Sequence, residues 1–187
     1  KIINQENIDF IDNLSNTISK LNWVDSVQSI LDAPVLKSGN QSLTDLATKQ
    51  LTLKSDGLIL AEVEQEFIDS PIFSELVISK DGKTSGIIIN IKNNIAYSNI
   101  LERRNNLKSI LLPSSLDKKQ LNVLENEYNL LKKNIDIERG KNIKEIRLII
   151  SENKNNQIKL HLGGVAMIAD DTISFVKNDI LLFGIGI

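Results

Sequence analysis

A long helical pattern over residues 95–153 sets the strongest limit on how this chain folds. Apolar side chains recur there at steps of three and four residues, the spacing of one helix face: Leu121, Leu124, Tyr128 and Leu131. Pro113 is the principal break, because proline lacks the backbone donor and clashes with the preceding helical turn. We expect one helix before the proline, over about 95–111, and more helix after it. Residues 138–140 either join two helices or continue a single one.

Shorter patterns on either side predict the other elements. Helices are expected over 7–21, 61–69 and 166–182, strands over 23–31 and 157–162, and a hairpin over 75–91 with its turn at 80–83. The turn contains Asp81 and Gly82, a pair that supplies the positive φ angles of a tight turn. Residues 87–89 are three consecutive isoleucines, which predicts a central strand covered on both faces. Ser42, followed by Asp45, predicts another helix start.

The order of these elements indicates an α+β fold. If residues 1–3 end a first strand, the order matches the ferredoxin-like βαββαβ plan with helical insertions. The insertions would be a helical insert at about 35–70 and the long helical section at about 95–153. We expect one domain over residues 1–179.

Composition excludes several kinds of function. The chain has 22 Lys and Arg against 24 Asp and Glu, for a net charge of −2, so no basic face for nucleic acid is expected. It contains no cysteine, which excludes disulfides, thiolate metal sites and cysteine nucleophiles. Its one histidine, His161, excludes a zinc site built on two imidazoles. We therefore expect no enzymatic activity, no catalytic residues, no cofactor and no metal.

Two glycine motifs have structural explanations. Gly82-Lys83-Thr84 resembles the end of a phosphate-binding loop, but position 77 is Val77 where that loop needs glycine, and a strand is expected to follow. We interpret it as the hairpin turn. Gly163-Gly164 precedes a helix whose free amides could meet an anion, but a sharp strand-to-helix turn is the better account.

The charged and polar candidates also have simpler interpretations. Solvated or structural positions are expected for the pair Asp170-Asp171 with Asp179, for His161, for Glu62, Glu64 and Glu66, and for Arg103-Arg104. The functional alternatives are a hard-cation site for the aspartates and a general base for His161. For the glutamates the alternative is an acid/base pair, and for the arginines it is contact with lipid headgroups or with an acidic partner. Asn13 and Asn40 match the glycan acceptor pattern, which chance explains in an Asn-rich chain.

Residues 180–187, ILLFGIGI, form an uncharged apolar run at the end of the sequence. A membrane span needs roughly 20 apolar residues, so this run cannot cross a bilayer by itself. It is either a buried terminal element or the beginning of a truncated transmembrane helix. The absence of an initiator Met suggests an excised fragment or processing.

Four segments in order resemble one family, the resistance–nodulation–division (RND/MMPL-like) exporters. Trp23–Ile30 is similar to a strand of their extracytoplasmic loop, and Pro71–Thr84 is similar to their hairpin with the Ser-x-Asp-Gly-Lys turn. Ile158–Met167 resembles the strand and Gly-Gly turn, although Ala166 stands where proline is common. Phe175–Ile180 looks like the lead-in to the second membrane helix.

The resemblance implies a periplasmic porter domain of a bacterial inner-membrane exporter, driven by a cation gradient and acting on amphiphilic, lipid-like or drug-like substrates. Residues 180–187 would then begin a membrane helix. The implied partners are the rest of the same chain, with a second porter domain and a transmembrane bundle, and a lipid or amphiphile substrate; a homo-oligomer is also allowed. The family's coupling carboxylates lie inside membrane helices, so no site residue is carried over and the substrate-binding residues are unknown. The alternative is an extracytoplasmic ligand-binding or sensor domain of a membrane receptor.

Overall fold

The computed structural model of the 187-residue chain describes residues 1–38, 50–109, 115–155 and 157–184, the side chains of 115–117 excepted. These residues form two compact units, 1–92 and 93–187. The sequence predicted one domain over 1–179, whereas the first unit ends just before the long helical section. The units are described separately below.

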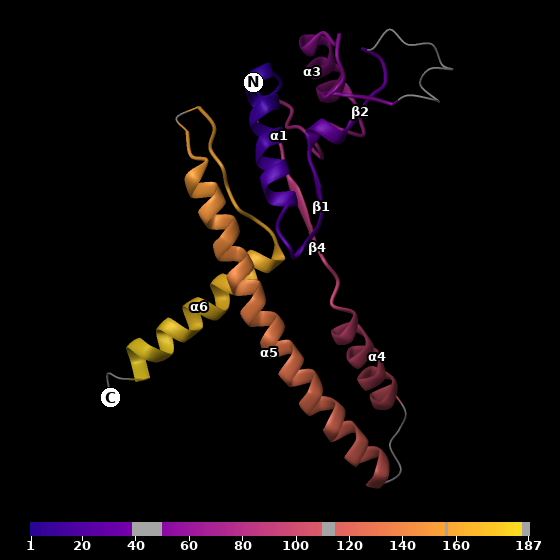
Figure 1. Ribbon diagram of the computed structural model, residues 1–187, viewed down its shortest axis with the longest axis vertical. Coiled ribbons are helices and arrows are strands. Elements are labelled where there is room, and N and C mark those ends of the chain that lie inside the picture. Colours follow the sequence, from indigo (N-terminus) through magenta and orange to yellow (C-terminus); the bar gives the residue numbers. More distant parts are fainter. Residues whose placement is uncertain (39–49, 110–114, 156, 185–187) are drawn as a thin grey trace. The chain divides into compact units, whose positions relative to one another are not determined.

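The described part of the first unit mixes short strands with helices (Figure 1). Its elements in chain order are α1 (Gln5–Ser19), β1 (Val24–Gln28), the short 3-10 helix η1 (Ile30–Asp32), β2 (Pro34–Val35), β3 (Leu51–Thr52), α3 (Leu60–Asp69) and β4 (Ile88–Ile91). The helices predicted over 7–21 and 61–69 are thereby confirmed within two residues. The strand predicted over 23–31 is confirmed as far as Gln28. There Ser29 caps η1, and its side chain and backbone exchange hydrogen bonds with Leu31 and Asp32.

The core of the first unit lies between α1, α3 and the loops around them. On α1 the side chains at three- and four-residue steps are buried, as their spacing predicted: Ile8, Ile11, Leu14 and Ile18. Phe67 of α3 is fully buried and meets Phe73 edge-on, with ring centroids 5.0 Å apart. Ile30, Leu31, Val35, Val63 and Ile78 complete the centre of this cluster.

Strand pairing in this unit differs from the predicted hairpin. The turn itself is present: Gly82 has φ +65°, its N–H donates to the Ser79 carbonyl at 2.9 Å, and the Ser79 N–H donates to Thr84. Beyond the turn the two arms meet at a bridge between Ile78 and Ser85, and the Ser85 hydroxyl donates to the Val77 carbonyl at 2.8 Å. Strand β4 pairs instead with β1, in an antiparallel ladder that runs from Val24 to Gln28.

The prediction that residues 87–89 form a central, covered strand is wrong. Among the described residues β4 pairs with β1 alone, in a two-stranded sheet, and its other edge has no partner there. Ile88 and Ile91 are 58% and 49% exposed. A run of β-branched residues therefore marked the strand correctly, but it could not show how many neighbours the strand has.

The second unit is helical. It contains α4 (Ile95–Ser109), α5 (Ser115–Glu152) and α6 (Val165–Gly184), and α4 packs along α5 (Figure 1). Helix α5 runs unbroken through residues 138–140, so continuation is the alternative that holds. The last predicted helix, 166–182, is confirmed by α6.

The strand predicted over 157–162 is absent from the described structure. Its side chains still alternate: Ile158, Leu160 and Leu162 are half-buried, while Lys159 and His161 are exposed. The alternation predicted the two faces, but no neighbouring strand pairs with the segment among the described residues. A strand needs that partner as well as a pattern.

The α+β class is confirmed, because helices occur together with small antiparallel sheets. The sheets described are two separate pairs, β1–β4 and β2–β3, in place of the single sheet that a ferredoxin-like fold requires. Residues 1–3 form no strand in the described structure; the Ile2 N–H donates to the Gly82 carbonyl at 2.7 Å, which joins this segment to the turn. The helix start at Ser42 and Asp45 lies outside the described residues.

Candidate functional site

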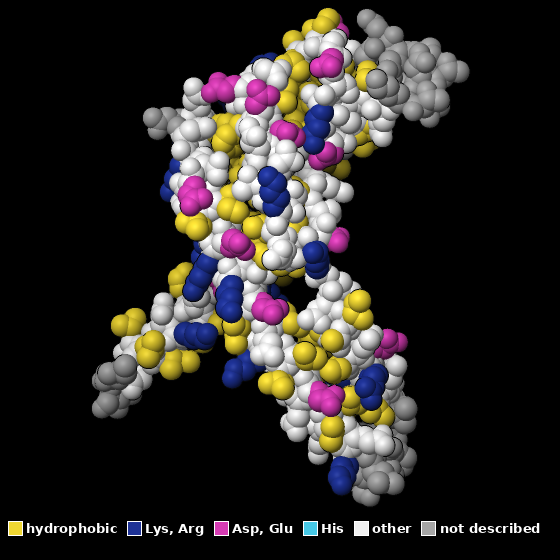
Figure 2. Space-filling view, in the orientation of Figure 1, with side chains coloured by type: hydrophobic (Ala, Val, Ile, Leu, Met, Phe, Trp, Pro, Cys, Tyr) yellow, Lys and Arg dark blue, Asp and Glu magenta, His cyan; other side chains and the backbone are white. Residues whose placement is uncertain are grey.

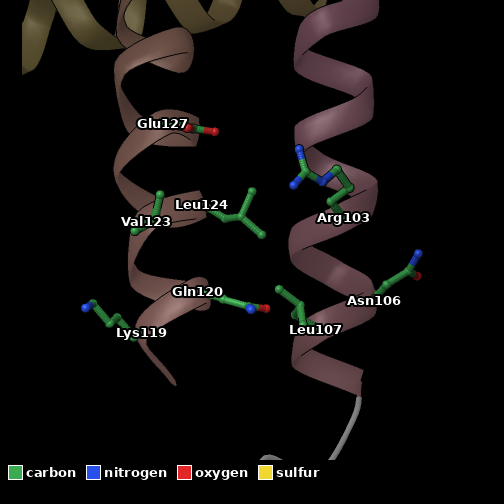
Figure 3. Close-up of a pocket in the computed structure, with 8 residues that line it drawn as sticks. All are labelled: Arg103, Asn106, Leu107, Lys119, Gln120, Val123, Leu124 and Glu127. Atoms are coloured by element: carbon green, nitrogen blue, oxygen red, sulfur yellow. The ribbon is translucent and has the colours of Figure 1, made fainter. Parts of the chain in front are cut away.

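The described part of the second unit has an open groove between the C-terminal half of α4 and the start of α5. Its volume is about 730 Å³. Leu107 and Leu124 face each other across it, and Arg103 extends toward α5 (Figure 3). The remaining lining residues are Asn106, Lys119, Gln120, Val123 and Glu127.

The charges of this groove do not favour one kind of ligand. The acidic Glu127 and the basic Arg103 both point into the space between the helices, whereas Lys119 points outward (Figure 3). Lysine and arginine attract anions and the glutamate repels them, so neither sign of ligand charge is selected. We therefore assign no ligand to the groove.

Next to the groove, two tyrosines and an arginine join α4 to α5. The rings of Tyr97 and Tyr128 stack at 5.4 Å, and their hydroxyls are 3.1 Å apart. The Arg104 guanidinium lies 4.1 Å from the centre of the Tyr128 ring, a cation–π contact. Arg104 is therefore a packing residue, not the solvated position that the sequence predicted, whereas Arg103 is exposed.

The two tyrosines have opposite pKa shifts. The hydrogen bond between the hydroxyls lowers the pKa of Tyr128 and raises that of Tyr97, and Arg104 lowers the pKa of Tyr128 further. Tyr128 therefore ionises first, and its oxygen then accepts from the Tyr97 hydroxyl. The cluster joins α4 to α5 through stacked rings, a hydrogen bond between hydroxyls and a cation–π contact.

Helices α5 and α6 meet at Gly140 and at Arg147. A Cβ atom on Gly140 would lie 3.0 Å from Asp170 Oδ1, so the glycine makes room for that carboxylate. Arg147 donates to Asp171 at 2.6 Å. The pair Asp170-Asp171 is therefore half-buried against α5, where the sequence predicted solvated positions. Among the described residues no cluster of His, Cys, Asp and Glu could hold a metal ion.

Helix α6 carries an extended apolar surface. None of its described residues is buried. Hydrophobic side chains line it in the space-filling view (Figure 2), and the exposed ones are Val165, Ile168, Ile173, Phe175, Val176 and Ile180–Phe183. Four consecutive residues, Ile180–Phe183, are 58% to 74% exposed, and four residues cover the whole circumference of a helix. In the described parts of the chain, no helix combines the length and apolar character that a bilayer span requires.

In the first unit, the three evenly spaced glutamates of α3 point in different directions. Glu64 is buried and its carboxylate pairs with the Lys1 ammonium at 2.9 Å, whereas Glu62 is exposed. Glu66 accepts four hydrogen bonds: from the N–H groups of Leu36, Lys37 and Ser38 and from the Ser38 hydroxyl at 2.7 Å. The glutamates are not equivalent, because two of them hold distant parts of the chain together.

The pKa of Glu66 lies below its usual range. Burial alone raises the pKa of this carboxyl, but the hydrogen bonds from Ser38, Leu36 and Lys37 lower it by more. Sequence reasoning missed this contact, because the donors are backbone groups about 30 residues away that carry no side-chain signature.

The remaining candidates occupy structural or solvent-exposed positions. Gly82-Lys83-Thr84 forms the turn described above, and no helix follows it directly. Gly164 has φ +108° directly before α6, where glycine is favoured, but the strand predicted to lead into this turn is absent from the described structure. His161 and Asn13 are exposed, and Asn40 lies outside the described residues.

No protein-family model, no curated protein and no solved structure matches this chain.

Proposed function

We propose that this chain is the periplasmic domain of an RND-type exporter in a bacterial inner membrane, joined to its membrane segment through α6. One observation carries the proposal: residues Ile180–Phe183 expose apolar side chains on every side of the helix. Water disfavours such a surface, and apolar side chains all around a helix are typical of one surrounded by lipid or by other helices. The four sequence segments that resemble the exporter family, in the family's order, agree with this location.

The charges of α6 support the same interpretation. Its charged residues are Asp170, Asp171, Lys177 and Asp179, and no charged residue follows Asp179 as far as Gly184. The helix therefore changes from amphipathic to uncharged toward its C-terminal end. This gradient is expected where a helix passes from an aqueous domain toward a bilayer. We also propose that the domain is a porter domain derived from the ferredoxin-like fold. In this proposal, added helices take the place of part of the sheet.

In this proposal the domain has no chemistry of its own. Its task is to change its packing as the membrane segment moves, so that a path for an amphiphilic substrate opens and closes. The energy comes from a cation gradient across the membrane bundle. The rest of the chain, including a second porter domain, supplies the other side of the path.

Export by the intact protein tests the proposal. Bacterial cells that produce it should accumulate less of the fluorescent amphiphile N-phenyl-1-naphthylamine than cells with empty vector, and a proton uncoupler should abolish the difference. The variant Leu181→Asp/Phe183→Asp should reduce the amount of protein in the membrane fraction, whereas Asn178→Asp, on the same helix, should not. An intact protein that fractionates with soluble proteins would contradict the proposal. A membrane protein that binds the amphiphile without exporting it would favour the sensor alternative.

A further inference from the structure

Gly140 occupies an unusual place for a glycine. It lies in the interior of the 38-residue α5, where glycine is the poorest helix former except proline. The explanation is spatial: a side chain at this position would meet Asp170 of α6, whose Oδ1 lies 3.0 Å from the place of a Cβ. The absence of a side chain at Gly140 therefore leaves a gap on the surface of α5, and Asp170 of α6 lies beside this gap. We call the gap the notch.

Two turns further along α5, a second contact fixes the same crossing. Arg147 donates to Asp171 at 2.6 Å, and Asp171 is the residue after the one seated in the notch. One contact alone would let α6 slide or rotate along α5. Contacts at Gly140 and Arg147 with adjacent residues of α6 together fix the point at which α6 crosses α5.

We infer that Gly140, Arg147, Asp170 and Asp171 form a positioning joint that passes movement of α6 to the α4–α5 pair. The inference rests on the proposed function, in which α6 continues toward the membrane segment. Helix α5 is unbroken, and α4 is packed along it through the Tyr97–Tyr128 pair. A displacement of α6 at the joint therefore moves α5 as a rigid rod and carries α4 with it.

The two contacts of the joint are short, but the ion pair in it contributes little electrostatic energy. The side chains of Arg147 and Asp171 are 45% and 34% exposed, so water screens their attraction. Reversing one charge replaces this weak attraction with repulsion at the crossing, so α6 should shift while the unit stays folded. Restoring the opposite pair should return α6 to its place, which a role in general stability would not require.

Charge reversal in the intact exporter tests the joint. Spin labels are attached to Asn134→Cys on α5 and Asn178→Cys on α6, both exposed, in a cysteine-free version of the intact protein. Arg147→Asp and Asp171→Arg should each broaden or shift the distance between the labels and reduce amphiphile export several-fold. The double reversal should restore both. Lys144→Asp, an exposed position one turn earlier on α5, should change neither.

A second pair of variants tests the notch independently. Gly140→Leu should displace α6 and reduce export, and Gly140→Ala should do so to a smaller degree. Because the crowding atom belongs to Asp170, adding Asp170→Ala should relieve the effect of Gly140→Ala.

The distance between the spin labels and the export of the amphiphile together distinguish this inference from the proposed function. Unchanged distances in the single reversals, or no rescue by the double reversal, would overturn the joint even if export continued. A responsive distance in a protein that exports nothing would uphold the contact, and would overturn both the proposed function and the inferred transmission.

Discussion

The two units of the molecule differ in how far their apolar side chains are buried. In residues 1–92 helices, loops and short strands enclose a core, with Phe67, Leu31 and Val63 completely buried. In residues 93–187 neither α4 nor α6 has a buried residue in the described structure. The first unit therefore encloses its core between several elements, whereas the buried apolar residues described in the second belong to α5: Leu124, Ile143, Ile146 and Ile149.

The aromatic residues allow each unit to be followed separately. The only tryptophan, Trp23, lies in the first unit, and both tyrosines, Tyr97 and Tyr128, lie in the second. Tryptophan fluorescence therefore reports unfolding of the first unit, and tyrosine absorbance reports the second.

Phe67→Ala should produce the largest loss. It removes a fully buried ring from its contact with Phe73 and leaves a cavity, which typically costs about 3–5 kcal/mol of the free energy of unfolding. Urea denaturation followed by Trp23 fluorescence measures the loss. Ile72→Ala, at a position 61% exposed, is the matched control and should change stability little. Similar losses for the two variants would contradict a self-contained core.

Gly82→Ala should have the next largest effect. Gly82 has φ +65°, and a Cβ there would lie 2.8 Å from Oε1 of the buried Glu64. Backbone strain and crowding together should cost about 1–3 kcal/mol. Gly86→Ala, where a Cβ meets nothing within 4 Å, is the control for loss of glycine alone. Equal denaturation midpoints for the two variants would show that the turn is not constrained as described.

Glu66→Gln should make the first unit less dependent on pH, with a loss near 1 kcal/mol at pH 7. The pKa of Glu66 is lower in the folded protein than its ordinary value of 4.5, so the folded state binds this proton less readily than the unfolded state. The stabilisation is therefore complete above pH 4.5 and disappears as the pH falls through the folded pKa. Urea denaturation at several pH values should show the difference between wild type and variant closing on acidification. The same substitution at the exposed Glu62 is the control, and a difference that grew toward low pH would contradict the hydrogen bonds described.

The smallest effect concerns the tyrosine pair of the second unit. Tyr97→Phe removes the hydroxyl that lowers the pKa of Tyr128, so the pKa of Tyr128 should rise toward 10.0. Absorbance titration measures it directly, because Tyr128 is then the only tyrosine. Arg104→Met should raise the same pKa and cost about 0.5–1 kcal/mol, the usual value of an exposed cation–π contact. Arg103→Met is the control; a pKa that moved with Arg103 and not with Arg104 would reverse their assignments.

The helices were predictable because their evidence is local. The spacing of Ile8, Ile11, Leu14 and Ile18 specifies one face of α1, and each of these side chains is buried. The same local reasoning found α3, α4, α5 and α6. Only the continuity through Gly140 was left open, since a glycine inside a helix has no local justification. Its reason, the carboxylate of Asp170, comes from another helix.

The strands and the polar contacts were less predictable because they depend on distant parts of the chain. Residues 157–162 have the alternation of a strand but no pairing partner in the described structure. Ile88 belongs to a strand with an uncovered face, which a string of isoleucines cannot reveal. The contact between Glu66 and residues 36–38 joins a side chain to backbone donors, and Arg104 is distinguished from Arg103 only by the ring of Tyr128.

The unbroken α5 also sets a length scale. At 1.5 Å per residue its 38 residues extend about 55 Å, several times the distance of roughly 8 Å over which salt screens charges in the cell. Ionisable groups near Lys119 are therefore electrically independent of those near Arg147. Substitutions at the tip of the α4–α5 pair can accumulate without disturbing the balance of charge at the opposite end of the rod.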